Sequence, residues 1–344
     1  MIIPYGLSKN YYDARGQLYL DMMNTIPEDN TNVMRIFAYE VNQQARVFCL
    51  LQEYIQGETM TDYLIEEVFT PLESSSWMNE KKQKEIKKNK KLLFFKLLDC
   101  MMDSITTINS RGYYHIDVKG DNFMVDTTQS CKIIDFDSTV NVMTDLSTVN
   151  VAFTKKYAAP EVVYHILMKF CGYSESYICD LPYATDNWID RNFYTGESLS
   201  NSDPFAIGII IYQTLFNSDN PFYLERELDN YCNTNDLSYH ECNIGYLASI
   251  YHKISKNIYN KSSFNYEFIT TLVGSRVIPD NFYEVMNRYY TRYGNGKYNI
   301  DFSKEELNAL FFIMSRCLMI NPDYRLTMTE AKYLLEETVL RLNK

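Results

Sequence analysis

Two short apolar runs near the start of the chain, separated by a polar stretch, predict a β-hairpin. Residues 33–40 (VMRIFAYE) and 46–53 (RVFCLLQE) have β-like composition, and VNQQA between them supplies the turn. A different period follows in residues 92–112, where apolar side chains recur at helical spacing before a glycine. This stretch is expected to be a buried helix with a C-terminal stop.

The pattern changes again after residue 113. The runs FMVD and CKIIDFD, within residues 113–137, predict two short strands flanked by polar turns. Beyond residue 161 the spacing is mostly helical, and helices are expected at 203–216, 304–320 and 327–342. Three polar or irregular segments are expected to be insertions: 66–91, 172–202 and 223–303.

Composition and charge narrow the classes of protein. The chain has 344 residues, 46% of them apolar, which suffices for one large or two modest domains. Its net charge of −11 argues against a general binder of nucleic acid or of anionic membranes. The longest apolar run, at residues 205–212, is too short to cross a bilayer.

The cysteines and the first residues bear on the cellular compartment. None of the eight cysteines forms a C-x-x-C pair or a zinc-like cluster with histidine, so they are expected to be reduced thiols. The N-terminal residues have no apolar signal core. We therefore expect an intracellular, cytoplasmic protein, in the host cytoplasm if the chain is viral or a secreted effector.

A lysine-rich run covers Lys81 to Lys91, with seven lysines in eleven positions. The first interpretation is a solvated helix face or loop. The alternative is a docking patch for an acidic partner.

Residues 113–125 (YYHIDVKGDNFMV) carry the strongest chemical signal. His115, Asp117, Lys119 and Asn122 spell H-x-D-x-K-x-x-N, and Asp135 follows after the apolar CKII. Transfer of phosphate to a hydroxyl needs a carboxylate to accept the proton, a cation, and ligands that hold metal ions against the phosphates. These residue types supply all of those parts.

These motifs resemble the eukaryotic Ser/Thr protein kinases. FTKKYAAPE (153–161) is similar to the end of their activation segment, and DPFAIG (203–208) to the start of a central helix. NPF (220–222) and SRCLMINPDYR (315–325) follow in family order, and the resemblance pairs Arg325 with Glu161. It implies an α+β, protein-kinase-like fold with a reduced β-containing N-lobe at 1–55 and a mainly helical C-lobe at 56–344.

The resemblance also implies roles and ligands. The cofactors would be ATP and Mg²⁺, and the partners a protein substrate or a partner kinase. Glu53 and Ile55 of EYIQG would offer backbone hydrogen bonds to adenine, with Gln52 guarding the pocket. Asp117 would be the base, Lys119 the cation, and Asn122 and Asp135 the metal ligands. His115 would be a packing residue, and Thr154 would order the loop around Asp117.

Two departures lie within the motifs. Ile116 stands where the family usually has an arginine that contacts a phosphorylated activation loop, which makes such control less expected. Asp137 stands where the metal-binding triplet usually ends in glycine. It could add a metal ligand or stiffen the turn.

The expected N-lobe differs most from the pattern of the kinase family. NTNVMRIF (30–37) resembles the strand that follows the long helix of the kinase N-lobe. That helix is therefore expected at about 13–26. No room is left before it for the usual three strands. Residues 1–27 contain no G-x-G-x-x-G loop, no V-A-I-K strand and no glutamate, with Tyr19 or Asp21 near the glutamate's place. Because those parts orient phosphates, their loss motivates the alternative of a pseudokinase or binding module. The first hypothesis, by resemblance, is a protein kinase that transfers the γ-phosphoryl group of ATP to Ser or Thr hydroxyls of a protein substrate. Small-molecule phosphotransferases of the same fold are disfavoured by Lys119 and the A-P-E motif.

Overall fold

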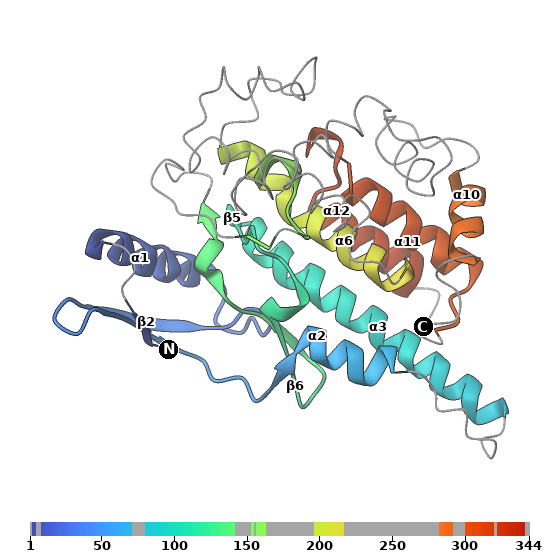
Figure 1. Ribbon diagram of the computed structural model, residues 1–344, viewed down its shortest axis with the longest axis horizontal. Helices are drawn as coiled ribbons and strands as arrows, with labels where there is room; N and C mark the ends of the chain where they lie inside the picture. The colour runs from blue at the N-terminus through green and yellow to red at the C-terminus, as the bar shows by residue number, and fades with distance from the viewer. Residues whose placement is uncertain are drawn as a thin grey trace, which may run out of the picture.

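The computed structural model describes residues 2–4, 8–70, 80–141, 153–154, 156–162, 196–216, 282–291, 300–319 and 322–340. A small part with a β-sheet and one helix lies beside a larger part made mainly of helices (Figure 1). This mixed α+β arrangement is that of a kinase-like fold, as predicted.

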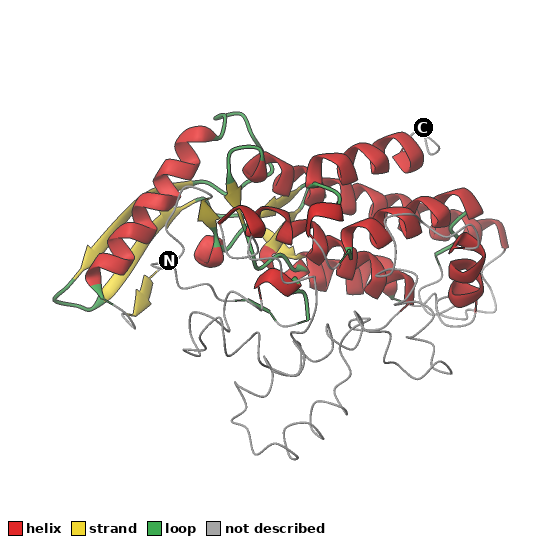
Figure 2. Ribbon diagram, turned by 90° about the horizontal axis from the view of Figure 1, so that it is seen from above, coloured by secondary structure: helices red, strands yellow, loops and turns green. Residues whose placement is uncertain are grey.

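The small part is a three-stranded antiparallel sheet with a helix on one face (Figure 2). The strands are β1 (Ile2–Pro4), β2 (Ile36–Asn42) and β3 (Val47–Gln52), in the order β1-β3-β2. The hairpin of β2 and β3 confirms the prediction from the apolar pattern, whereas β1 was not predicted.

Helix α1 (Lys9–Thr25) begins at Ser8, whose side chain accepts a hydrogen bond from the backbone N–H of Tyr11. The expected helix at 13–26 is therefore present and begins earlier. Its buried face includes Tyr19, which packs with the ring of Phe48 on β3. A Cβ on Gly16 would lie 2.3 Å from the Tyr39 ring, so glycine lets α1 approach β2 closely.

The large part is organised around α3 (Glu80–Asn109), whose second half is buried. Around it lie α6 (Ser202–Phe216), α11 (Lys304–Cys317) and α12 (Met328–Leu335), the last continued by a π-helical turn at Glu336–Leu340 (Figure 1). Helix α10 (Phe282–Tyr289) packs against α11. Ser303 and Thr327 form capping boxes with Glu306 and Glu330, which fix the starts of α11 and α12.

Short elements connect the two parts. Strand β4 (Gly57–Thr59) leads into α2 (Met60–Tyr63) and a π-helical turn at Leu64–Phe69. It joins a sheet of order β4-β6-β7 with β6 (Phe123–Asp126) and β7 (Cys131–Ile133), which confirms the two strands predicted there. Strands β5 (Tyr113–Tyr114) and β8 (Val140–Asn141) pair separately, and 3-10 turns occupy Gly120–Asn122, Phe136–Ser138, Gly196–Asn201 and Pro322–Tyr324.

The lysine-rich run forms the first turns of α3, so this helix begins twelve residues before the predicted start at residue 92. Part of the run is engaged by the fold. Lys91 pairs with the buried Glu306 at 2.9 Å, Lys87 lies 3.7 Å from Asp301, and Lys90 donates to the Thr70 carbonyl at 2.6 Å. These contacts anchor the helix, while Lys81, Lys84 and Lys88 are exposed.

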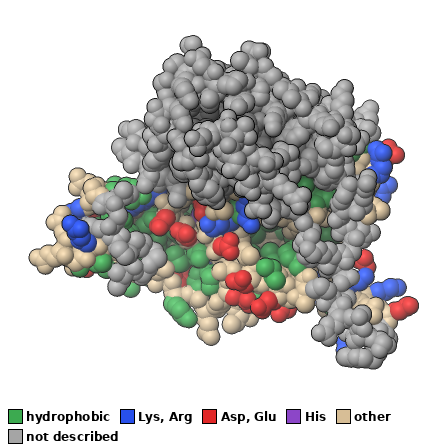
Figure 3. All heavy atoms as spheres, in the orientation of Figure 1, with side chains coloured by type: hydrophobic (Ala, Val, Ile, Leu, Met, Phe, Trp, Pro, Cys, Tyr) green, Lys and Arg blue, Asp and Glu red, His purple; other side chains and the backbone are tan. Residues whose placement is uncertain are grey.

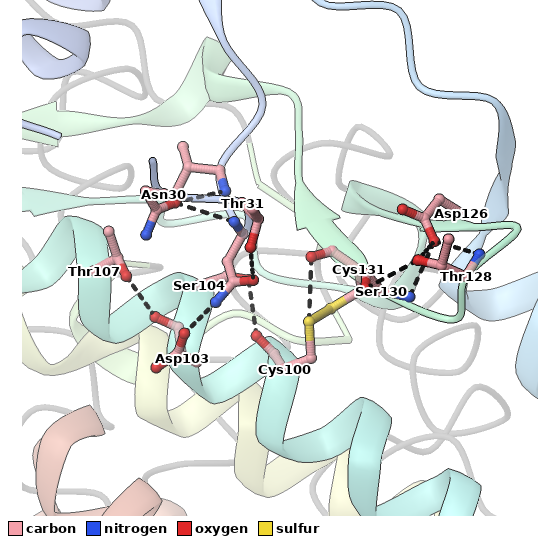
Figure 4. The surroundings of a disulfide bond; sticks show 12 residues. Asn30, Thr31, Cys100, Asp103, Ser104, Thr107, Asp126, Thr128, Ser130 and Cys131 are labelled. Carbon is pink, nitrogen blue, oxygen red and sulfur yellow. Dashed lines mark hydrogen bonds between the residues drawn. A yellow bond between two sulfur atoms is a disulfide. The ribbon is translucent and has the colours of Figure 1, made fainter. Parts of the chain in front are cut away.

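The expectation that all eight cysteines are reduced thiols is wrong for one pair. Cys100 on α3 and Cys131 on β7 form a disulfide, with their Cα atoms 6.1 Å apart (Figure 4). Sequence separation hid this pair, because the two residues meet only when β7 packs on α3. Among the described residues, Cys49 and Cys317 are free.

Two further expectations concern regions that are described only in part. Most of the segments 172–202 and 223–303 lies outside the described residues, although α10 falls within the second. NPF at 220–222 also lies outside them. No helix in the described part of the chain is long and apolar enough to cross a membrane.

Candidate active site

The loop that carries Asp117 is held in place by one carboxylate from α6. Asp203 accepts hydrogen bonds from the backbone N–H groups of His115 at 2.9 Å and Ile116 at 2.8 Å, and from the Asn109 side chain at 2.9 Å. Ile116 has φ of 70°, a left-handed conformation that is strained for a β-branched residue. The buried Asp203 therefore secures a backbone turn that Ile116 would not adopt by itself.

Asp117, Lys119, Asn122 and Thr154 form one hydrogen-bonded group. The carboxylate of Asp117 accepts from Lys119 Nζ at 2.8 Å, from Asn122 Nδ2 at 3.3 Å and from the Thr154 backbone N–H at 2.7 Å. Lys119 Nζ also lies 2.8 Å from Thr154 Oγ1. The structure thus brings together the three residues predicted from the H-x-D-x-K-x-x-N spacing, and Thr154 orders the group as expected.

The side chain of Asn122 has a defined orientation. Its amide nitrogen donates to the Asp117 carbonyl at 2.8 Å as well as to the Asp117 carboxylate. This arrangement leaves the amide oxygen as the atom that can face a cation. Asn122 lies at the end of the Gly120–Asn122 turn, just before β6.

Asp135 lies two residues after β7 in the left-handed conformation, with φ of 59°. Its carboxylate accepts a hydrogen bond of 3.4 Å from the backbone N–H of Asp137 and so caps the following 3-10 turn. Burial raises the pKa of Asp135, repulsion from the carboxylates of Asp137 and Asp117 adds to this, and His115 opposes it. A site with this excess of negative charge is suited to a cation.

His115 is buried between the Asp117 loop and the turn at Asp135, and it acts as a packing residue, as predicted. Its Nε2 lies 3.0 Å from the Ile134 carbonyl oxygen, and its ring lies 5.8 Å from the ring of Phe136. These contacts join the Asp117 loop to the turn at Asp135 from the side of the large part.

The same turn is held on its other side by α1. Tyr19 Oη donates to Asp137 Oδ1 at 2.6 Å, and Arg15 donates to the backbone carbonyls of Asp137 and Thr139. Burial, with the Asp137 carboxylate next, raises the pKa of Tyr19 far above its ordinary value, so the hydroxyl keeps its proton. Asp21, the other residue considered for the place of the missing glutamate, instead accepts from Gln17 at 2.7 Å.

Sequence reasoning missed Arg15 and left the role of Asp137 open between a metal ligand and a stiffener of the turn. Because one Asp137 oxygen is bound by Tyr19, the second interpretation fits better. No motif in the sequence marked Arg15, since its partners are backbone carbonyls more than 120 residues away.

Groups of the predicted hinge segment already make hydrogen bonds and an ion pair within the protein. The backbone N–H of Glu53 donates to the Arg35 carbonyl at 2.8 Å, and the Glu53 carboxylate pairs with Lys132. Tyr54 is 88% exposed and Ile55 is half-buried against the core. Gln52 Oε1 is buried without a protein hydrogen-bond partner. The predicted adenine contacts therefore remain a prediction, and the N–H of Glu53 is already used within the small part.

The described residues contain no cluster of three or more His, Cys, Asp or Glu side chains that could hold a metal by itself. Mg²⁺ bound to nucleotide typically takes one or two protein ligands and completes its shell with phosphate oxygens and water. Binding of a nucleotide-bound metal by Asn122 and Asp135 therefore needs no further protein ligand and stays a prediction.

Comparison with known proteins agrees with this geometry. Residues 20–177 match the family model described as protein kinase domain, a segment that runs from α1 past Asp117, Asp135 and Glu161. No curated protein matches the chain. This match, which covers less than half of the chain, and the kinase-like fold together support a protein kinase or kinase-like protein.

Proposed function

We propose that this protein is a Ser/Thr protein kinase that transfers the γ-phosphoryl group of ATP to a hydroxyl of a protein substrate. The observation that carries the proposal is the group formed by Asp117, Lys119, Asn122 and Thr154, with hydrogen bonds of 2.7 to 3.3 Å. A chain that had lost phosphoryl transfer would have no chemical need to hold these polar groups together at one half-buried site.

In this proposal each residue has one task. Asp117 accepts the proton of the attacking hydroxyl, and its hydrogen bonds to Lys119, Asn122 and Thr154 fix the direction of its oxygens. Lys119 balances the charge that spreads over the transferred phosphate. Asn122 and Asp135 hold Mg²⁺, which, when bound, neutralises charge on the phosphate oxygens.

Ser/Thr acceptors are supported by the contact between Lys119 and Thr154. By resemblance to the Ser/Thr protein kinases, Lys119 and Thr154 belong to the Ser/Thr form of the loop and activation segment. Here they lie 2.8 Å apart, and both contact Asp117. An acceptor hydroxyl that reaches Asp117 therefore has to lie beside them.

A transfer assay tests the proposal. The chain is incubated with Mg²⁺, γ-labelled ATP and a peptide library that has Ser, Thr or Tyr at one fixed position. We expect label on Ser and Thr peptides and a loss of at least about a hundredfold in Asp117→Asn, because the general base is removed. Asp121→Asn is the matched control, since Asp121 is an exposed acid in the same loop and should keep its activity. Equal activity of Asp117→Asn and wild type would contradict the assignment.

Nucleotide binding is tested separately from transfer. A ligand at a hundred times its Kd stabilises a protein by about 2.7 kcal/mol, which a melting curve resolves. We expect MgATP to raise the Tm of the wild type and not that of Asp135→Asn. A shift that persists in the variant would remove Asp135 from the metal site.

A binding module that has lost transfer is the second candidate. It is favoured by the small part, where the single lysine before residue 55, Lys9, pairs with Asp13 on the exposed start of α1. No other lysine occurs in residues 1–55. Capture of a partner kinase by the wild type and by Asp135→Asn alike, without any transfer, would favour this candidate.

The distribution of surface charge indicates which kinds of partner, other than the substrate, the protein could bind. Basic side chains form no continuous surface in Figure 3, where acidic groups lie among them on the described part of the face. This distribution fits a protein partner better than a nucleic acid, as the net charge of −11 does. An acidic partner at the exposed lysines of the Lys81–Lys91 run, and a cytoplasmic location, are further proposals.

A further inference from the structure

The turn after Asp135 is attached to α1 by contacts that the proposed reaction does not itself require. Tyr19 Oη donates to the Asp137 carboxylate at 2.6 Å, and the Arg15 guanidinium donates to the carbonyls of Asp137 and Thr139. The side chains that come from α1 are buried, with Tyr19 at 1% and Arg15 at 6% exposure. Contacts shielded from water to this extent hold their geometry more firmly than surface contacts do.

The residues that α1 contacts, Asp137 and Thr139, lie in the same short turn as Asp135. Asp137 N–H donates to the Asp135 carboxylate, and Thr139 N–H donates to the Phe136 carbonyl at 3.0 Å, which closes the turn. Asp135 itself has φ of 59°, a conformation that neighbouring contacts must maintain for a residue other than glycine. A shift of Asp137 would therefore rotate or displace the Asp135 carboxylate.

An acid at position 137 has a physical advantage over glycine here. Glycine would offer no side chain to Tyr19 and would leave the turn more freedom before folding. In this chain one carboxylate oxygen of Asp137 accepts a hydrogen bond from Tyr19 and so holds the turn against α1. On the opposite side the turn is held by Phe136, whose ring lies 5.8 Å from that of His115.

We propose that Arg15, Tyr19 and Asp137 form an anchor that sets the position of Asp135, so that the attachment of α1 controls Mg²⁺-dependent nucleotide binding. All three are positioning residues, because they act through Asp135. The inference rests on the proposed function in so far as Asp135 holds nucleotide-bound Mg²⁺. It explains how a chain without a recognisable lysine–glutamate pair in its small part can still couple α1 to the metal site.

The first test measures ADP binding by calorimetry with and without Mg²⁺ for wild type, Tyr19→Phe, Asp137→Ala and the double variant. Each single variant should weaken Mg²⁺–ADP binding by about tenfold, as expected for loss of a hydrogen bond to a charged group. Binding of ADP without Mg²⁺ should change less than about twofold. The double variant should be no weaker than either single variant by more than about twofold, because both remove the same contact.

Two variants separate positioning from simple loss of stability. Asp137→Asn keeps an oxygen that can accept from Tyr19 and should recover most of the Mg²⁺-dependent affinity. Tyr39→Phe removes a hydroxyl from the same part of the chain, where the ring packs on Phe48 and beside Gly16, and should leave Mg²⁺-dependent binding unchanged. Equal losses with and without Mg²⁺, or additive losses in the double variant, would overturn the proposal.

A measurement without ligand distinguishes failure of the anchor from failure of the proposed function. Hydrogen exchange at the amides of residues 136–139 should quicken in Tyr19→Phe and stay unchanged in Tyr39→Phe. If the wild type binds no nucleotide but exchange responds in this way, the proposed function fails and the anchor stands as a structural link. If exchange at 136–139 does not respond to Tyr19→Phe, the anchor itself is wrong, whatever the nucleotide result.

Discussion

Arg325 and Glu161, which are 164 residues apart in sequence, form a bidentate ion pair with both side chains fully buried. Arg325 Nη1 lies 2.5 Å from Glu161 Oε1, and Nη2 lies 3.1 Å from Oε2. The guanidinium also donates to the carbonyls of Met319 at 3.0 Å and Asn201 at 2.5 Å. One arginine therefore ties together the end of the activation segment, the start of α6 and the turn after α11.

Removing one member of this pair should destabilise the protein strongly. Glu161→Gln leaves the Arg325 charge buried and only partly compensated, and such changes cost about 3–5 kcal/mol. Urea unfolding measures the loss. Glu330→Gln on α12 changes an exposed residue whose amide oxygen can still accept from the Thr327 N–H, so it should cost far less, about 0.5 kcal/mol or below. A loss of less than about 1 kcal/mol in Glu161→Gln would contradict the burial of this pair.

Asp203 offers a test of the support beneath the catalytic loop. Asp203→Ala removes an acceptor from the N–H groups of His115 and Ile116 and leaves them buried without it. Each unsatisfied group costs about 1–3 kcal/mol, so stability should fall by several kcal/mol, as measured by urea unfolding. Transfer activity should fall as well, because the Asp117 loop loses its backbone support.

Ser315→Ala on α11 is a suitable control for Asp203→Ala. Its hydroxyl is buried but donates only to the Phe312 carbonyl of the same helix, at 2.8 Å. It should lower stability modestly and leave activity intact. If Asp203→Ala behaved like this control, Asp203 would not be the residue that holds the loop.

Asp99 on α3 should make stability depend on pH. Burial raises its pKa, Lys332 opposes this, and Glu336 and Asp103 reinforce it, while Asp99 Oδ1 has no hydrogen-bond partner. A carboxyl whose pKa is higher in the folded state binds protons more tightly there. Its contribution therefore falls as pH rises from the ordinary Asp pKa of about 3.9 through the raised value.

Asp99→Asn removes this titration. At pH 7 the variant should be at least as stable as the wild type, and its relative advantage should shrink as the pH is lowered towards about 4. Urea unfolding at several pH values measures the difference. An advantage that grew on acidification would contradict the raised pKa of Asp99.

The Cys100–Cys131 disulfide predicts a redox-dependent stability. It closes a loop with a sequence separation of 31, for which chain-entropy estimates give about 3–4 kcal/mol. Under oxidising conditions Cys100→Ser should therefore be less stable than the wild type, and the difference should shrink when a reductant is present. Peptide mapping without reductant should recover the two cysteine peptides joined.

Cys317 provides the contrast to that pair. Burial raises the pKa of the Cys317 thiol to about 12, so it should resist alkylation in the folded protein. Cys49, a half-buried free cysteine, should react before Cys317. Rapid native labelling of Cys317 would contradict its burial.

The sequence by itself determined the local elements and the chemistry of the loop. The short apolar runs at β2 and β3, the helical spacing in the second half of α3, and the turns around β6 and β7 depend on neighbours a few residues apart, so the local pattern reveals them. The same holds for Asp117, Lys119 and Asn122, which lie within six positions and meet through one short turn. The start of α3 was misjudged because a lysine-rich surface helix has little apolar period.

Only the tertiary structure decided which distant residues meet. The contacts of Arg15 and Tyr19 with the turn at Asp137, and the pairing of Cys100 with Cys131, require the packing of α1 and α3 against strands far away in sequence. Strand β1 is likewise defined by its pairing with β3. Burial and hydrogen bonding between distant segments supply the free energy of these contacts. Neighbouring residues in the sequence therefore show no local pattern that would predict them.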